Sequence, residues 1–450
     1  MLMAVIVADN LYDVQCEIEK VQHQVDGFEL RFDNSPSLTT DFLQALRQLS
    51  PLPMIFTLRS QSQGGSFQGS QVEYFQHVIE LCQGQPDYID LEWDSPKSCF
   101  EYIANHFPHI KIICSYHHFQ GGTINFQALY RHLEDFPFAI LKLAIFCHTS
   151  LEALALMHEM TFVAYTRPRT MIAMGSAGQF LRILGPIMGN AIDYAGHIAP
   201  GQLSVIDWVD IYHYHQLNSI TRVYALLGTP VDKSLGHIFH NQKIREGQQN
   251  LVYVKIELEK GQLPEFLQQC LVLPFDGFSV TMPLKMDVAR LLQTAQPAIN
   301  TLKRGPQGWW GCNTDGLAVV DILALKHPQN ILILGAGGAA LGIAHALSEA
   351  FHTVRLFHHH VEKVKEFGFQ AFDAKEQLDF DIMINTLPPN ATMQVCINPK
   401  CILVDINYNQ HSNFADAAKQ LGCHCIDGYG IFIAQALLQR QFWFEYSLMP

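Results

Sequence analysis

The sequence has no apolar run long enough to cross a membrane as a helix, which takes about 20 residues. Its first residues, Met1–Asp9, have neither the basic flank nor the small-residue cleavage pattern of a signal peptide. They are more typical of a first β-strand. We therefore expect a cytoplasmic protein without a membrane partner.

Clusters of basic residues are also absent. The 450 residues include 29 Lys and Arg against 42 Asp and Glu, which gives a formal net charge of -13. A nucleic-acid surface needs Lys and Arg gathered in runs or patches, so the composition argues against a nucleic-acid partner. Anionic small molecules stay possible as substrates, because one pocket can be basic in an acidic protein.

Paired cysteines and internal repeats are missing as well. The 11 cysteines lack the spacing of a disulfide framework, which fits a reducing compartment. The segments Cys423–Cys425 and His358–His360 contain metal-ligand residue types, but neither has a second ligand pair at the spacing of a zinc site. We therefore expect no metal.

The residues that are present predict at least two domains, because 450 residues exceed one core of ordinary size. Over residues 1–215, short strand-like runs alternate with helical stretches. The runs are 2–8, 26–32, 53–58, 87–92, 110–116, 138–144, 170–175 and 203–206. Eight strands alternating with helices predict a closed parallel (β/α)8 TIM barrel, because closure leaves no exposed sheet edge.

Lys142 is the most informative residue of this first half. It lies in an apolar run that begins at Phe138, and the sequence predicts no acidic partner close to it. We expect its amine to be partly desolvated and able to attack a ketone to form an imine. His117 stands at the end of the preceding strand and could act as a base. Each residue alone could be an ordinary surface side chain. Together they favour carbonyl chemistry at the strand ends.

The second half contains a strand, a glycine turn and a helix start in the order that dinucleotide binding requires. The strand covers 330–334, and the turn supplies the candidate cofactor-binding residues Gly335, Ala336, Gly337, Gly338 and Ala339. We expect a Rossmann-type domain over 325–429. A separate substrate-binding region would cover 219–324, with a C-terminal helix over 430–450 returning to it.

The next strand, 353–357, is followed by His358, His359 and His360 where an NAD-specific fold would normally place an acid. The missing carboxylate makes a 2′-phosphate tolerable, and partly protonated imidazoles could attract it. NADP (as NADPH) is therefore the expected cofactor. The alternative is that these histidines form a solvated turn and select neither cofactor.

Several motifs of the first half follow the order of one enzyme family. They are Asp26–Asp33 with its E-x-R-x-D pattern, Phe56–Arg59, Ser115–Phe119, Met174–Gly175, Leu181–Gly185 and Ala199–Gln202. Together with Lys142 they resemble type I 3-dehydroquinate dehydratase. The resemblance implies that Lys142 forms a Schiff base with 3-dehydroquinate and that His117 is the base and acid. The implied substrate-binding residues are Glu29, Arg31, Arg59, Arg182 and Gln202.

Two positions depart from that pattern. Gln63 stands where the family carries a glutamate that pairs with the histidine, and an amide stabilises imidazolium less than a carboxylate does. We expect a weaker base or a shifted pH optimum. Ile198 replaces a serine of the loop that covers the substrate, which removes one hydrogen bond and could loosen binding.

The second half has its own ordered set of motifs. They are Gly228–Asn241, Ser279–Lys285, Ala298–Thr301, Gly311–Gly316, Asp405–Asn409 and Gly428–Gln435. They resemble shikimate dehydrogenase, which implies that Lys285 and Asp315 are the catalytic pair. The implied substrate-binding residues are Ser234, Thr281, Asn300, Tyr408 and Gln435, and Gly428 joins the cofactor-binding set.

This second resemblance is also incomplete. Gly236 replaces the second serine of the substrate loop, and Ser279 replaces an asparagine. Taken alone, Asp315 could instead be the cap of the helix that begins near Gly316, and Lys285 could be a solvated lysine.

The two resemblances imply a bifunctional enzyme that converts 3-dehydroquinate to 3-dehydroshikimate and then to shikimate. Two alternatives stay open. One half could have drifted, so that the dehydrogenase acts on quinate or uses NAD. The chain could also be a non-catalytic sensor of these metabolites, although binding alone needs no imine-forming amine.

Overall fold

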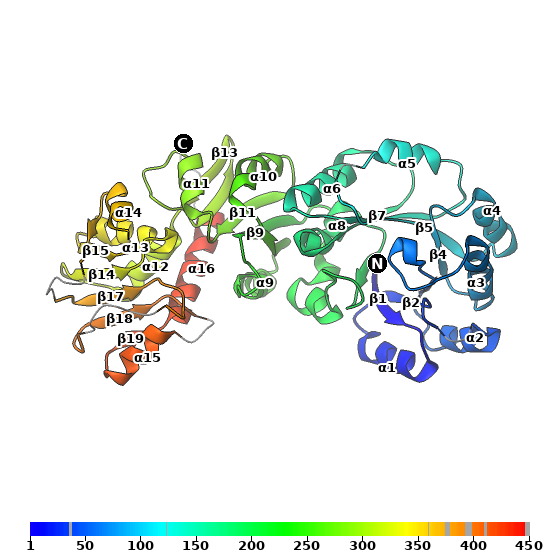
Figure 1. Cartoon of the computed structure of the whole chain (residues 1–450), viewed down its shortest axis with the longest axis horizontal. Coiled ribbons are helices and arrows are strands. Elements are labelled where there is room, and N and C mark those ends of the chain that lie inside the picture. Colours follow the sequence, from blue (N-terminus) through cyan, green and yellow to red (C-terminus); the bar gives the residue numbers. More distant parts are fainter. Residues whose placement is uncertain are drawn as a thin grey trace. The chain divides into compact units, whose positions relative to one another are not determined.

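The computed structural model of this protein describes residues 1–35, 38–122, 124–358, 360–373, 379–391, 398–408 and 412–445. The chain divides into two compact units. One consists of Met1–Arg222 with Asn241–Val254, and the other of Val223–His240 with Lys255–Pro450. Figure 1 shows the elements of each unit in the colours of the sequence.

The first unit contains a nearly closed parallel barrel of eight strands, as the sequence predicts (Figure 1). The strands are β1 (Leu2–Val7), β2 (Gly27–Arg31), β3 (Met54–Thr57), β4 (Tyr88–Glu92), β5 (Lys111–His118), β6 (Ile140–Phe146), β7 (Arg169–Met174) and β8 (Asp193–Ala195). Their order is β7-β6-β5-β4-β3-β2-β1-β8, so each strand from β1 to β7 lies beside the next one in sequence, and β8 pairs with β1.

Helices follow most of these strands. They are α1 (Leu11–Val21), α2 (Thr40–Gln48), α3 (Gln71–Gln83), α4 (Lys97–His106), α5 (Phe126–His132), α6 (Ser150–Phe162), α7 (Gln179–Ile183) and α8 (Gly185–Met188). Local sequence sets their starts. Ser70 and Glu73, for example, form a reciprocal capping box at the start of α3, which satisfies two backbone donors.

The eighth strand differs from the prediction. We expected it at 203–206, but β8 lies at Asp193–Ala195. The predicted run instead leads into a π-helical turn, Asp207–Ile211. Ser204 causes this, because its hydroxyl donates to Asp207 Oδ2 at 2.8 Å and accepts from the Asp207 N–H at 3.0 Å. Buried Leu203 and Val205 imitate the two-residue period of a strand.

Asn190 holds β7 and β8 together where the barrel closes. The Ala191 N–H donates to the Arg169 carbonyl at 2.8 Å across this seam. The Asn190 side chain accepts from the Met171 N–H at 2.9 Å and donates to the Met171 carbonyl at 3.1 Å. It also donates to Asp193 Oδ1 at 2.8 Å. One amide therefore satisfies groups on both strands.

The barrel interior is layered, and the layers decide where the polar site lies. An apolar layer consists of Met3, Ile55, Tyr88, Ile113, Ile140, Ile192 and Tyr194. Side chains two positions apart on a strand face the same side. The next inward layer therefore contains polar residues that follow these positions, namely Thr57, Asp90, Ser115 and Lys142. One layer of the barrel interior is therefore apolar, and the next is polar and charged.

The second half begins with a five-stranded sheet of order β10-β9-β11-β12-β13. Its strands are β9 (Arg222–Gly228), β10 (Leu251–Glu257), β11 (Phe275–Val280), β12 (Thr301–Gly305) and β13 (Gly308–Cys312). The accompanying helices are α9 (Gly236–Glu246), α10 (Leu263–Cys270) and α11 (Lys285–Leu291). Helix α16 (Gly428–Phe444) contacts this sheet, where Trp443 Nε1 donates to the Leu302 carbonyl at 2.9 Å.

The remaining sheet is parallel and has six strands in the order β16-β15-β14-β17-β18-β19. They are β14 (Asn330–Leu334), β15 (Thr353–Phe357), β16 (Gln370–Ala371), β17 (Ile382–Asn385), β18 (Ile402–Asp405) and β19 (Cys425–Ile426). Its helices are α12 (Thr314–Leu323), α13 (Gly338–Glu349), α14 (Val361–Glu366) and α15 (Asn413–Gln420). This strand order is that of a doubly wound nucleotide-binding fold, which confirms the predicted Rossmann-type sheet.

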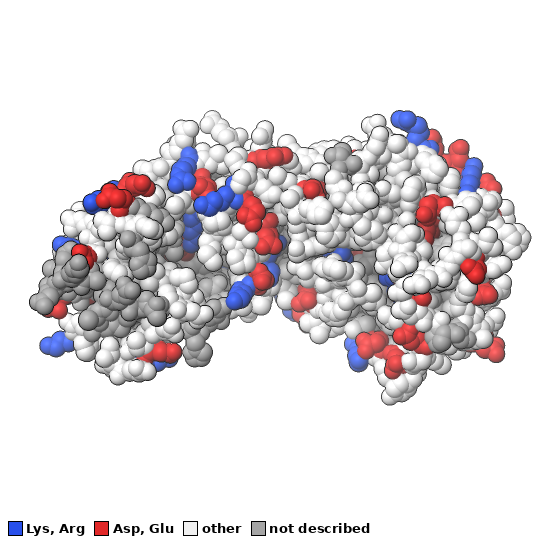
Figure 2. Space-filling model, in the orientation of Figure 1, with Lys and Arg blue, Asp and Glu red and all other residues white. Residues whose placement is uncertain are grey.

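The surface shows how charge is distributed. On the face in Figure 2, Lys and Arg are interspersed with Asp and Glu and form no single basic patch. Among the described residues, no helix is both long and apolar enough to span a bilayer.

The barrel seam gives a first testable prediction. Replacing Asn190 by Ala leaves the Met171 N–H and carbonyl without their partner, which should destabilise the barrel by about 2 to 3 kcal/mol. Chemical unfolding, monitored by a signal that reports on the barrel, measures this change in the free energy of unfolding. Asn105→Ala, at an exposed position of α4, is the control and should change stability by less than about 0.5 kcal/mol. Equal stability of the two variants would contradict the assignment.

Candidate functional site

Lys142 lies inside the barrel with only 5% of its surface exposed. Its Nζ donates to Glu29 Oε1 at 3.0 Å and to Asp90 Oδ2 at 3.2 Å. The predicted burial is therefore correct, but the predicted lack of an acidic partner is wrong. Both carboxylates come from other strands, β2 and β4, so the local sequence around Lys142 could not reveal them.

Arg59 supplies the second buried cation of this cluster. Its guanidinium pairs with Asp90 at 2.7 Å and with Glu92 at 3.3 Å, and it donates to Ser115 Oγ at 2.8 Å. Burial alone would raise the pKa of the Asp90 carboxyl, but Arg59 and Lys142 outweigh it and lower that pKa well below its usual range. Asp90 is therefore a fixed anion between two cations.

His117 is placed on the strand beside Lys142. Ser115 is the residue of β5 that pairs with Lys142 of β6, and His117 follows two positions later on the same side. Among the described residues, its buried Nδ1 has no hydrogen-bond partner. Burial first, and then the charges on Arg59 and Lys142, lower the pKa of His117 well below its usual value. The resting imidazole is therefore neutral.

Gln63 contacts the backbone of His117. Its Oε1 accepts from the His117 N–H at 3.1 Å. The side chain is buried, with 7% of the residue exposed, so the amide holds the strand end that carries the imidazole. Because the residue at position 63 is an amide, the weaker base expected from the sequence stays a prediction.

Arg31 and Glu29 both belong to β2, but their side chains make different contacts. Arg31 pairs with Asp33 at 2.6 Å, and Asp33 also accepts from the Arg59 N–H at 3.0 Å. Glu29 accepts from Lys142 and, at 3.0 Å, from the Thr57 hydroxyl. Glu29 and Arg59 thus join the Lys142 cluster directly, whereas Arg31 braces the segment that contains Arg59.

Arg182 and Gln202 both form hydrogen bonds with the backbone of the barrel loop 198–200. Arg182 donates to the backbone carbonyls of Ala173 at 2.9 Å and Pro200 at 3.2 Å. No carboxylate among the described residues pairs with this guanidinium, and burial lowers the pKa of Arg182 to about 10. Gln202 Oε1 accepts from the N–H groups of Ile198 and Ala199 and so shapes the loop. An anionic ligand would compensate the buried cation.

Four residues of this cluster escaped the sequence reasoning, namely Asp90, Glu92, Ser115 and Tyr194. The first three lie on predicted strands, at the inward positions that follow apolar ones. A search for polar residues at those alternate positions could have found Asp90 and Ser115. Tyr194 gave no such signal, because its strand was assigned to the wrong segment.

In the second half, Lys285 Nζ lies 2.5 Å from Asp315 Oδ2. Lys285 begins α11, and Asp315 stands in the first turn of α12. The cap of α12 is Asn313, whose side chain accepts from the Gly316 N–H, so the alternative assignment of Asp315 as the cap is wrong. Asp315 is therefore available to orient the lysine.

A buried amide network stands beside this pair. Asn300 Oδ1 accepts from the Thr314 N–H at 2.7 Å, and its Nδ2 donates to the Thr314 hydroxyl at 3.0 Å. Ser279 donates to Gln439 Oε1 at 2.9 Å, which links β11 to α16. The asparagine-to-serine departure at 279 thus retains a hydrogen bond. Thr281 follows β11, where its N–H donates to the Leu227 carbonyl at 2.8 Å.

The other predicted substrate residues come from two further segments. Ser234 Oγ accepts from the Gly236 N–H at 3.2 Å, so the departure at 236 supplies a backbone contact to the retained serine. Tyr408 stacks on Phe432, with ring centroids 4.5 Å apart. Burial, the largest effect, raises the pKa of Tyr408, although a hydrogen bond with Ser234 opposes it. Gln435 donates to the Phe432 carbonyl at 3.0 Å.

The predicted cofactor turn joins β14 to α13. Gly335 has a φ of 117°, which only glycine adopts readily, and Gly337 is the N-cap of α13. A Cβ at Gly337 would meet nothing within 4 Å, whereas one at Gly338 would lie 2.8 Å from the Lys285 Cβ. The helix start is thus open on one side and close to Lys285 on the other. This arrangement fits a pyrophosphate near the predicted catalytic pair, Lys285 and Asp315.

The other predicted cofactor-binding residues lie in the same turn, after β15 and at the start of α16. Ala336 is buried and Ala339 is half-buried. His358 follows β15, and its Nδ1 accepts from the His360 N–H at 3.0 Å. His359 lies outside the described residues, as does Asn409. Gly428 begins α16 against the Asn407 carbonyl. Across the described ranges, no three or more His, Cys, Asp or Glu side chains are grouped to hold a metal ion.

Comparison with protein families gives two matches, in the order of the two sites. Residues 2–219 match the family "Type I 3-dehydroquinase". Residues 226–303 match "Shikimate dehydrogenase substrate binding domain". The first match contains every residue of the Lys142 cluster, and the second contains Lys285 and Asn300.

Individual proteins agree with these matches. A shikimate biosynthesis protein AroDE from Chlamydia pneumoniae is 32% identical over 473 aligned residues, which cover 100% of this chain and 96% of that protein. A shikimate dehydrogenase (NADP(+)) from Methanococcus aeolicus is 27% identical, covering 50% of this chain and 93% of its own length. The solved dehydroquinate dehydratase and shikimate dehydrogenase of S. pombe AroM is 19% identical with a TM-score of 0.44, and covers 99% of this chain and 95% of that one. Because the match to AroDE runs from end to end, this chain belongs to the bifunctional shikimate biosynthesis family, in which a type I 3-dehydroquinase is fused to a shikimate dehydrogenase.

Proposed function

We propose that the barrel dehydrates 3-dehydroquinate through a Schiff base on Lys142 and that the second half reduces 3-dehydroshikimate to shikimate with NADPH. The observation that carries the first reaction is the buried amine of Lys142 on the strand beside His117, whose buried Nδ1 has no hydrogen-bond partner among the described residues. We assign the barrel to 1–215, substrate binding to 219–324 with 430–450, and the dinucleotide domain to 325–429. The ten described cysteines are free thiols, which supports a cytoplasmic location.

The first reaction starts when the Lys142 amine attacks the ketone carbon. The carbonyl oxygen leaves as water with two of the three protons of the Lys142 ammonium, and the nitrogen keeps the third as an iminium that withdraws electrons from the neighbouring carbon. His117 then takes the proton from C2, and the electron pair of that bond passes toward the iminium. The C1 hydroxyl leaves as water with the proton that His117 returns, and hydrolysis frees Lys142.

Binding of the substrate relies on the charges that the barrel holds ready. Arg182, a buried cation without a carboxylate partner, would take the substrate carboxylate as a bidentate pair. Glu29 and Arg59 are fixed by contacts across strands, so they can orient ring hydroxyls without much loss of conformational entropy. Arg31 and Gln202 would assist through the segments that they brace.

The second reaction needs a proton for the oxygen that becomes a hydroxyl. NADPH supplies the hydride when it is bound, and Lys285 delivers the proton. Asp315, 2.5 Å from the amine, orients it toward the reacting oxygen. Asn300, Gln435 and Ser234 offer neutral donors and acceptors to the ring, together with Thr281 and Tyr408. The cofactor would lie on Gly335, Ala336, Gly337, Gly338 and Ala339, with Gly428 and His358 as further cofactor-binding residues. His359, proposed for the same role, lies outside the described residues.

Trapping with borohydride tests the Schiff base. Incubation with 3-dehydroquinate and sodium borohydride should add the reduced ligand to Lys142, as found by peptide mass spectrometry. Lys142→Met should abolish both the adduct and the dehydratase activity, because Lys142 is the amine that contacts the buried carboxylates Glu29 and Asp90. Lys111→Met, an exposed lysine at the start of β5, is the matched control and should retain both. Binding of 3-dehydroquinate to the wild-type chain without an adduct on Lys142 would support the alternative that the chain is a non-catalytic sensor.

The pH dependence of the dehydratase tests the role of His117. A histidine acts as a base when its ring is neutral. Because the pKa of His117 is lowered, its ring stays neutral at pH values below the ordinary pKa of histidine. The acid limb of the pH profile of kcat/KM should therefore lie below pH 6.5. Gln63→Glu adds an anion near the ring, which raises that pKa and should move the limb to higher pH by about one unit. Gln61→Glu adds the same charge at an exposed position and should leave the limb in place. Coincident profiles for all three proteins would exclude His117 as the base.

Oxidation of shikimate tests the second half and its cofactor. We expect activity with NADP⁺ to exceed activity with NAD⁺, and the preference to fall in the variant His358→Ala with His359→Ala. Asp315→Asn should lower kcat about 100-fold or more, since proton transfer depends on the oriented lysine. Asp321→Asn, on the exposed side of the same helix, should retain activity. Faster turnover of quinate with NAD⁺ would favour the drifted alternative.

A further inference from the structure

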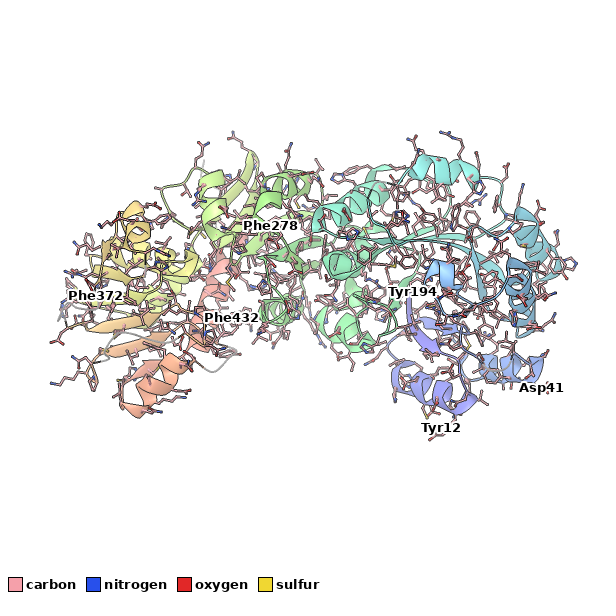
Figure 3. All side chains as sticks on the ribbon, in the orientation of Figure 1. Tyr12, Asp41, Tyr194, Phe278, Phe372 and Phe432 are labelled. Carbon is pink, nitrogen blue, oxygen red and sulfur yellow. The ribbon has the colours of Figure 1, made fainter. Side chains whose placement is uncertain are left out.

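Tyr194 of β8 lies against the reactive amine of the barrel. The Lys142 Nζ is 4.1 Å from the centroid of the Tyr194 ring, in addition to its contacts with Glu29 and Asp90. Figure 3 labels Tyr194 among the barrel strands. Only 6% of its surface is exposed, so water does not screen the contact.

The tyrosine hydroxyl is a buried polar group that the described part of the chain leaves without a hydrogen bond. Burial first, and then the charges on Glu29 and Asp90, raise the pKa of Tyr194 well above its usual value. The phenol therefore stays neutral, and its contribution to a neighbouring cation comes from the face of the ring.

Formation of the imine changes what the nitrogen of Lys142 can donate. The ammonium has three N–H donors, whereas a protonated imine has one, because two positions are taken by the double bond to carbon. The positive charge is retained, but at least one of the two hydrogen bonds to Glu29 and Asp90 must be lost. A cation–π contact needs only the charge, so it survives this change.

We propose that Tyr194 is a positioning residue of the dehydratase, whose ring face stabilises the iminium on Lys142 after its hydrogen bonds to the carboxylates have decreased. This inference rests on the proposed Schiff base. The C–N bond forms at the ketone carbon, the carbonyl oxygen departs as water, and the nitrogen retains its proton and charge. The ring neither donates nor accepts a proton in this step.

Packing alone is the competing explanation for Tyr194. The ring belongs to the apolar layer of the barrel interior, together with Tyr88. Tyr88 offers a matched position, because its ring lies in the same layer but faces Lys111 at 5.6 Å instead of Lys142. A role in packing should affect both positions alike, whereas stabilisation of the iminium should affect position 194 only.

Graded fluorination of the ring separates the two explanations. Tyr194→Phe should retain most of the activity, because it retains the ring. Phenylalanines with one, two and three ring fluorines at position 194 have nearly the same shape, but each fluorine weakens the negative ring face. At equilibrium with product, we expect the fraction of the chain that borohydride traps to fall stepwise, by about tenfold over the whole series. We expect kcat to fall in the same way. The same series at Tyr88 should show no trend.

The outcomes distinguish this inference from the function on which it rests. If the unmodified chain forms no adduct on Lys142, the Schiff base itself is wrong. If the adduct forms but its fraction and kcat do not change with fluorination, Tyr194 has a packing role only and the inference is overturned. A fall of equal size at Tyr88 overturns it as well. Thermal unfolding of each variant shows that the comparison concerns folded protein.

Discussion

The buried charge cluster around Lys142 is the constraint on which the barrel depends. Lys142 and Arg59 face three carboxylates, Glu29, Asp90 and Glu92, and none of the five residues is more than 5% exposed. Isolated charges at such depth would be very unfavourable, so each one requires its partners. The partners come from β2, β4, β6 and the segment after β3, and the parallel barrel points all of them at one place.

The two halves hold their reactive lysines differently, and the difference matches their proposed chemistry. Lys142 is nearly fully buried and contacts two carboxylates and an aromatic ring. Lys285 has one carboxylate, Asp315, and its side chain is 14% exposed. A nitrogen that becomes bonded to substrate needs surroundings that hold a cation through several steps. A proton donor needs only orientation and a path by which its proton is replaced.

The sequence predicted those features that depend on short-range patterns. Alternating apolar runs gave seven of the eight barrel strands, and the glycine turn at Gly335 gave the Rossmann-type sheet. The pairing of Lys142 with Glu29 could not be predicted in this way, because 113 residues separate them. The eighth strand was missed because it has only three residues, and a capped turn after Ser204 has the same alternation. Long-range contacts and short strands are therefore the features that the sequence alone could not predict.

The substitution at Gln63 becomes understandable when the position of the positive charge is followed through the proposed reaction. Removal of the C2 proton transfers one positive charge from the Lys142 nitrogen to the His117 ring, and the total charge of the site stays constant. At Lys142 that charge has two carboxylates and the ring of Tyr194 nearby. At His117 Asp90 favours it and Arg59 opposes it, Lys142 no longer carries a charge that would oppose it, and Gln63 offers a neutral amide. The transfer is therefore electrostatically uphill, and the residue at position 63 determines by how much. We infer that proton removal, rather than imine formation, is the step that this family member has made more difficult.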